Sequence, residues 1–96
     1  MNSNFDLTEY KYFKPIVNSI GFFGTNHIFL LHSRKDYYLS QDTVYQIIQK
    51  YDTDMYADQK AYLIRDLKKM ETHILMIYER HDLNTIKKYF KLYEKK

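Results

Sequence analysis

Residues 54–80 read DMYADQKAYLIRDLKKMETHILMIYER, and their apolar side chains recur in steps of four and three residues. These steps connect Leu63, Leu67, Met70, Ile74 and Ile77, with His81 next in the series. Such spacing is typical of a helix that keeps one apolar stripe against a partner helix. The sequence therefore predicts a long helix over about 54–80.

The predicted helix is long for a chain of 96 residues. At 1.5 Å per residue it would measure about 40 Å, whereas a compact domain of this size has a radius of gyration of about 12 to 13 Å. Its far end is therefore expected to pack on another helix, either in the same chain or in a second copy. The apolar stripe is thus interpreted as an interface or as intramolecular core.

Other segments also favour helices. Asp6 resembles an N-cap for a first helix that ends at Gly21, Ser40 resembles an N-cap for a helix over 40–51, and Asp82 for a last helix over 83–94. The apolar run after His27 fits a helix or a short hairpin over 27–39. The predicted fold class is all-α: a single domain (1–96), a small helical bundle with one long helix.

Two aromatic residues lie between the only two glycines of the chain, in the stretch Gly21-Phe22-Phe23-Gly24. Two glycines in four residues favour a turn, because glycine adopts positive φ angles without steric cost. We expect the Phe pair to fill the core beneath this turn.

The composition limits the chemistry. The chain contains no Cys, which excludes disulfides, thiol catalysis and the common structural zinc sites. The first residues lack the basic and apolar regions of a signal peptide, so we expect a cytoplasmic protein. Hydrophobic residues make up 45% of the chain and aromatic residues 18%, all of them Tyr or Phe. Tyr suits surfaces that are apolar on one side and wet on the other.

The pattern of polar residues indicates no enzyme. The four His, at positions 27, 32, 73 and 81, do not place two imidazoles on one helical turn, so no metal is expected. Asp52 and Asp54 are better explained as turn and cap residues than as a catalytic pair. We expect no cofactor and no small-molecule substrate. No membrane partner is expected either, because the basic last helix lacks a large apolar face.

The net charge is +3, and the basic excess lies near the C-terminus, where residues 80–96 carry six Lys/Arg against two Asp/Glu. Lys and Arg neutralise phosphates, and Tyr stacks on unpaired bases. The candidate nucleic-acid contacts are Arg34, Lys35, Lys87, Lys88 and Lys91. In the predicted last helix, however, Phe90 and Tyr93 face the core. Nucleic-acid binding is therefore the alternative hypothesis.

The first hypothesis is a non-catalytic protein-interaction module. It would self-associate as a homodimer through a coiled-coil stripe, or dock on a larger protein as a small regulator or inhibitor. The bias towards Lys, Ile, Tyr and Asn fits a phage or plasmid origin. The predicted partner-binding residues are Tyr37, Tyr38, Tyr56, Tyr62, Leu63, Leu67, Met70, Ile74 and Ile77.

Overall fold

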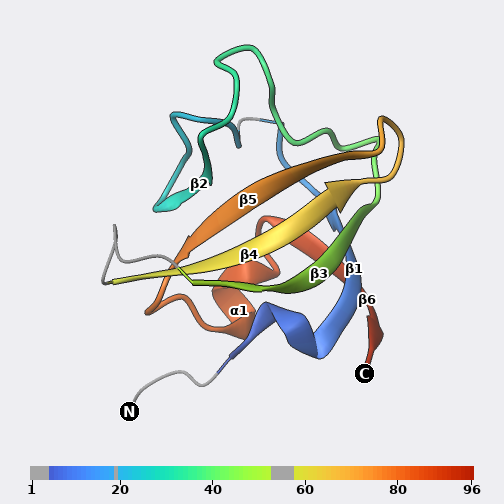
Figure 1. The fold of residues 1–96 in the computed structure, drawn as a ribbon. Helices are drawn as coiled ribbons and strands as arrows, with labels where there is room; N and C mark the ends of the chain where they lie inside the picture. Colours follow the sequence, from blue (N-terminus) through green and yellow to red (C-terminus); the bar gives the residue numbers. More distant parts are fainter. Residues whose placement is uncertain (1–4, 19, 53–57) are drawn as a thin grey trace.

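The computed structural model describes residues 5–18, 20–52 and 58–96, which form one six-stranded antiparallel sheet with short helical turns (Figure 1). In chain order the elements are η1 (Leu7–Glu9), β1 (Tyr10–Pro15), β2 (Ile28–Leu31), β3 (Tyr45–Tyr51), β4 (Gln59–Asp66), β5 (Glu71–Tyr78), α1 (Leu83–Ile86) and β6 (Phe90–Lys95). The strand order in the sheet is β2-β5-β4-β3-β1-β6. The predicted all-α helical bundle is therefore wrong, because the protein is mostly β.

The stretch predicted as the long helix forms the β4–β5 hairpin, as far as the structure describes it. Leu63 lies directly opposite Ile74, so the two residues belong to neighbouring strands rather than to one helical stripe. The 67–70 turn between the strands is held by Asp66, whose Oδ1 accepts hydrogen bonds of 2.9 Å from the backbone N–H groups of both Lys68 and Lys69. The described residues of this stretch form no coiled-coil stripe, so they offer no helical seam for self-association.

The other predicted helices are also wrong, although two of the predicted caps are confirmed. Asp6 accepts a hydrogen bond from Thr8 N at 2.9 Å, but it caps only the three-residue turn η1. Asp82 caps α1, which ends at Ile86 instead of continuing to residue 94. The predicted helix over 40–51 is replaced by β3. A cap defines where a helical turn begins but not how long it continues.

The 27–39 segment forms neither a helix nor a hairpin of its own. Its apolar run is strand β2, which pairs with the distant strand β5. Tyr38 instead forms an isolated bridge with Gly21. The described residues contain no helix with the length and apolarity needed to cross a bilayer.

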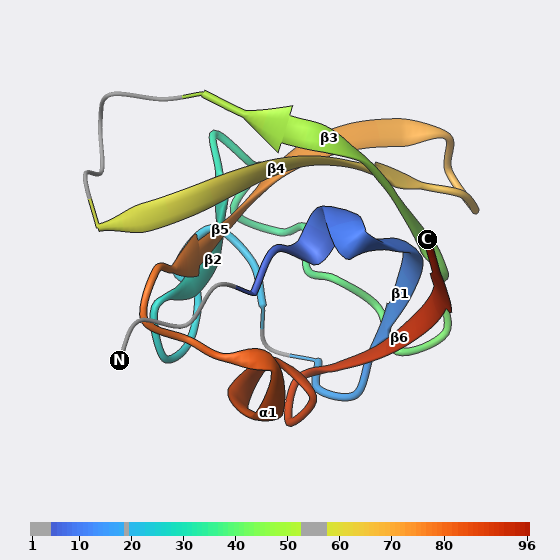
Figure 2. The same ribbon diagram turned by 90° about the horizontal axis from the view of Figure 1, so that it is seen from below.

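The sheet curls around its core (Figure 2). It wraps around η1, and α1 lies at the open side between the β2 and β6 ends. Phe13 of β1 is fully buried, with its ring centroid 5.2 Å from that of Tyr45 and 4.7 Å from that of Phe90. These rings join β1 to both of its neighbouring strands. The described residues span 37 × 29 × 21 Å.

The hairpin and the long helix predict opposite orders for the stability losses caused by Ile64→Ala and Leu63→Ala. Ile64 is fully buried on the core side of β4, whereas Leu63 lies on the outer side and is half-buried. Ile64→Ala is expected to lower the free energy of unfolding by about 2 to 5 kcal/mol, because it leaves a cavity. Leu63→Ala is expected to cost clearly less. Chemical denaturation measures both losses, and a larger loss for Leu63→Ala would contradict the strand register.

Candidate functional site

Side chains along β1 and β6 alternate between the core and the outer surface of the sheet. Phe13 and Phe90 point into the core, so Tyr12 and Tyr93 point outward. Residues three apart share a face in a helix but take opposite faces in a strand. This parity separates Tyr93 from the buried Phe90. It removes, for Tyr93 alone, the objection to nucleic-acid binding that both aromatic side chains face the core, because Phe90 is buried.

The outward side chains of this region form a surface that we call the Lys–Tyr face. It consists of Tyr12, Lys14, Gln46, Arg65, Lys91 and Tyr93. Tyr12 lies opposite Tyr93 on one side. On its other side Tyr12 lies opposite Gln46, which in turn lies opposite Arg65 of β4. Three strands and the edge strand β6 thus contribute to one surface.

Positive charges on the Lys–Tyr face lie close together without compensation. Lys14 is directly opposite Lys91, and like charges in this position destabilise a sheet. Among the described residues, no carboxylate forms an ion pair with Lys14, Arg65 or Lys91. The Lys91 ammonium instead lies 5.6 Å from the centre of the Tyr93 ring. A bound anion would relieve this repulsion.

A groove of about 510 Å³ opens beside the two tyrosines. Tyr12 and Tyr93 line it together with Val44, Leu67 and Glu94. Leu67 N donates a 3.3 Å hydrogen bond to Val44 O, which holds the start of the β4–β5 turn next to the residue that precedes β3. The groove therefore combines aromatic, apolar and acidic side chains at the border of a cationic surface.

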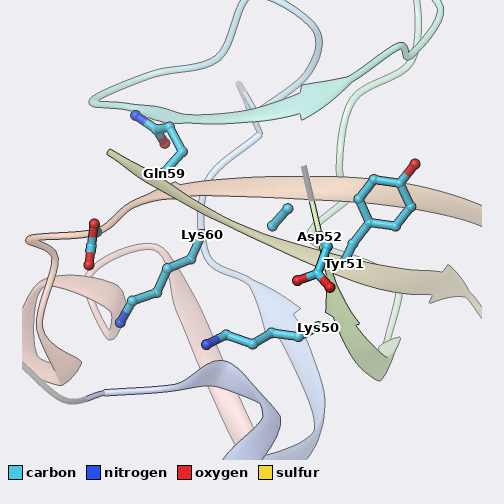
Figure 3. A pocket seen from close by; sticks show the side chains of 7 residues that line it. Lys50, Tyr51, Asp52, Gln59 and Lys60 are labelled. Atoms are coloured by element: carbon cyan, nitrogen blue, oxygen red, sulfur yellow. The ribbon is translucent and has the colours of Figure 1, made fainter. Parts of the chain in front are cut away.

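A second pocket, of about 270 Å³, lies at the other end of β3 and β4 (Figure 3). Lys50 and Lys60 extend from neighbouring strands towards the N-terminal segment. Lys50 Nζ lies 3.2 Å from Asp6 Oδ2, and Lys60 Nζ donates a 2.6 Å hydrogen bond to Phe5 O. Both ammonium groups thus contact the residues that immediately precede η1. We interpret this pocket as an anchor for the N-terminal segment rather than as a ligand site.

A third cluster is a buried network of hydroxyl and carboxylate groups. Tyr37 OH donates a 2.7 Å hydrogen bond to Asp66 Oδ2 and lies 2.9 Å from Tyr45 OH. Burial and these hydrogen bonds raise the pKa of Tyr37 far above its ordinary value. Burial alone would raise the pKa of Asp66, but hydrogen bonds from Lys69 N, Tyr37 OH and Lys68 N outweigh it and lower that pKa. The neutral Tyr37 phenol and the hydrogen-bonded Asp66 carboxylate connect the loop before β3 to the β4–β5 turn. Neither group offers a catalytic base.

His73 adjoins this network. Its ring stacks on Tyr37 with the centroids 4.1 Å apart, and its Nε2 lies 3.9 Å from Glu71 Oε1. Burial lowers the pKa of His73 below its ordinary value, despite the carboxylates nearby. No cluster of His, Asp and Glu that could hold a metal occurs in the described part of the chain.

The predicted partner-binding residues do not form one surface. Tyr37, Tyr62 and Ile77 are buried, whereas Tyr38, Leu67 and Met70 are exposed. Leu63 and Ile74 pair on the outer side of the sheet, and Tyr56 lies outside the described residues.

The predicted nucleic-acid residues divide into two regions. Lys91 belongs to the Lys–Tyr face, and Lys87 and Lys88 are exposed between α1 and β6. Arg34 and Lys35 lie in the loop after β2, at the opposite end of the molecule from β6 (Figure 1). Arg34 is also paired with Asp36 at 3.8 Å.

Sequence reasoning missed Tyr12, Lys14 and Arg65 as functional residues. The available signal was the alternation of Tyr and Lys at 12 and 14 and at 91 and 93. Only a strand places these alternate residues on one side.

The buried imidazole makes stability depend on pH. Because the pKa of His73 is lowered in the folded state, the unfolded chain takes up this proton first as the pH falls through about 6.5. The free energy of unfolding should therefore decrease between about pH 7 and 5, and His73→Gln should reduce that decrease. Urea denaturation at each pH measures the slope. Identical slopes for the two proteins would contradict the effect of burial on His73.

No protein-family model, curated protein or solved structure matches this chain, so its own residues carry the functional argument.

Proposed function

We propose that this protein is a non-catalytic binding protein for single-stranded nucleic acid, which it binds on the Lys–Tyr face. One observation carries the proposal: the Lys14–Lys91 pair lies beside the Tyr12–Tyr93 pair on one open sheet surface. Two lysines opposite each other favour an anionic ligand. Two neighbouring tyrosines favour a ligand with flat apolar faces. A nucleic-acid strand has both properties.

The aromatic pair favours single strands over duplexes. In a duplex the base faces are stacked on each other, so tyrosine side chains cannot reach them without unstacking the bases. On an unpaired strand, successive bases can stack on Tyr12 and Tyr93 while phosphates reach Lys14 and Lys91.

Two pairs of substitutions with equal loss of charge test the position of the site. Lys14→Gln with Lys91→Gln removes two positive charges from the Lys–Tyr face, whereas Arg34→Gln with Lys35→Gln removes two from the distant loop. Affinity for a fluorescent single-stranded oligonucleotide, measured by anisotropy over a range of salt concentrations, is the readout. The first variant should reduce the slope of log affinity against log salt by about 1.4, because each neutralised phosphate contributes about 0.7.

The second variant should leave that slope close to the wild-type value. If the two variants lose affinity equally, the net charge and not the Lys–Tyr face binds the strand. If the wild-type protein shows no salt-dependent binding to the oligonucleotide, the proposed function is wrong.

A second candidate function, docking on a protein partner, is supported by a different region. Phe22 and Phe23 do not fill the core as expected; the exposed fractions of these two residues are 39% and 73%. Thr25 and Ile28 exchange two backbone hydrogen bonds of 2.8 Å just after this pair. Gly24, at φ 67°, closes the turn. An exposed aromatic pair on a well-bonded loop suits an apolar pocket of a partner, because little entropy is lost on binding.

Affinity capture from cells that naturally contain this protein tests the second candidate. Phe22→Ser with Phe23→Ser should lose specific proteins that the wild-type protein retains. Ile16→Ser is the matched control, because Ile16 is an exposed apolar residue outside the loop. Retention of the same proteins by all three forms would contradict docking through the Phe pair.

A further inference from the structure

One acidic residue lies among the otherwise uncharged residues that line the groove. Glu94 lines the groove together with Tyr12 and Tyr93, although it lies next to Lys95 in β6. It is exposed, and among the described residues it forms no ion pair. A carboxylate at this place weakens the attraction of phosphates, so on electrostatic grounds alone it opposes the proposed function.

The backbone of Glu94 has an unusual conformation. Its φ is 55°, a left-handed value that costs a non-glycine residue free energy, and it occurs inside a strand. Regular alternation would place residue 94 on the opposite side from Tyr93. With the left-handed conformation at Glu94, Tyr93 and Glu94 instead line the same groove.

We propose that the groove is a base-binding subsite in which Glu94 selects a base with an exocyclic amino group, cytosine over uracil among the pyrimidines. This inference rests on the proposed function. A carboxylate accepts a hydrogen bond from the N4 amino group of cytosine. Uracil has a carbonyl oxygen at that position, and two acceptors facing each other repel.

The other walls of the groove suit the body of a base. Tyr12 and Tyr93 provide aromatic surface, while Val44 and Leu67 provide apolar contact. Continuation of the β1–β3 register places Val44 beside Lys14, so the groove adjoins the paired lysines. A nucleotide can therefore place its phosphate at the lysines and its base in the groove at the same time.

Matched homopolymers test the selection. Oligodeoxycytidylate and oligodeoxyuridylate of equal length differ in the groups that face Glu94, and an abasic oligomer of the same length has phosphates only. Wild-type protein should bind the cytosine oligomer about three- to tenfold more tightly than the uracil oligomer, as expected of one charge-assisted hydrogen bond near the surface. It should bind the abasic oligomer most weakly.

Glu94→Gln should abolish most of the preference for cytosine, whereas Glu79→Gln, the same charge change at an exposed residue outside the groove, should preserve it. If Glu94→Gln raises affinity for every oligomer by the same factor, the carboxylate acts only by charge and the inference is wrong. Equal binding of cytosine, uracil and abasic oligomers would also overturn it, while leaving the Lys–Tyr face as a phosphate site. Absence of binding to all three would instead remove the proposed function itself.

Discussion

The structure depends on the packing of one side chain, Phe13, between two neighbouring strands. Its ring contacts Tyr45 of β3 and Phe90 of β6, and all three side chains are fully buried. Burying aromatic side chains of this size provides much of the stability of a small domain. The same packing fixes the register of β1. Once Phe13 points inward, Tyr12 and Lys14 must point outward, and their partners on β6 follow.

A second constraint positions the groove. Asp66 accepts hydrogen bonds from the turn that follows it and from Tyr37, which belongs to the loop before β3. The carboxylate thus connects two segments that are distant in sequence. Leu67 follows Asp66 directly, and its N–H is bonded to Val44 O. A buried polar network therefore holds the apolar wall of a surface groove, although it does not contact the groove itself.

Local features were readable from the sequence, whereas strand pairing was not. Asp6 and Asp82 cap the turns that they were predicted to cap, because a cap depends on neighbouring residues only. The four- and three-residue steps at Leu63, Leu67, Met70 and Ile74 resemble a helical pattern because they run through one strand, a turn and the next strand. The alternating pairs Tyr62 and Ile64, and Leu75 and Ile77, were the competing signal.

The candidate site was predicted only in part for the same reason. Lys91 was identified, since a basic C-terminal segment is visible in the composition. Its partner Lys14 is far away in the sequence, and no local sequence pattern indicates that β1 and β6 are neighbours. Arg34 and Lys35 resembled Lys91 in charge but lie at the other end of the molecule. Periodicity reports which residues share a face, not which strands meet.

We propose that the outer side of β1 and β6 is the surface that contacts a nucleic-acid strand. The most direct measurement is an amide NMR titration with an unlabelled oligodeoxycytidylate of about ten nucleotides, a length within the range that one small β domain covers. We expect shift changes concentrated at Tyr12, Lys14, Lys91, Tyr93 and the 67–70 turn. Changes confined to the Arg34 loop or to Phe22 and Phe23, or no changes at all, would contradict it.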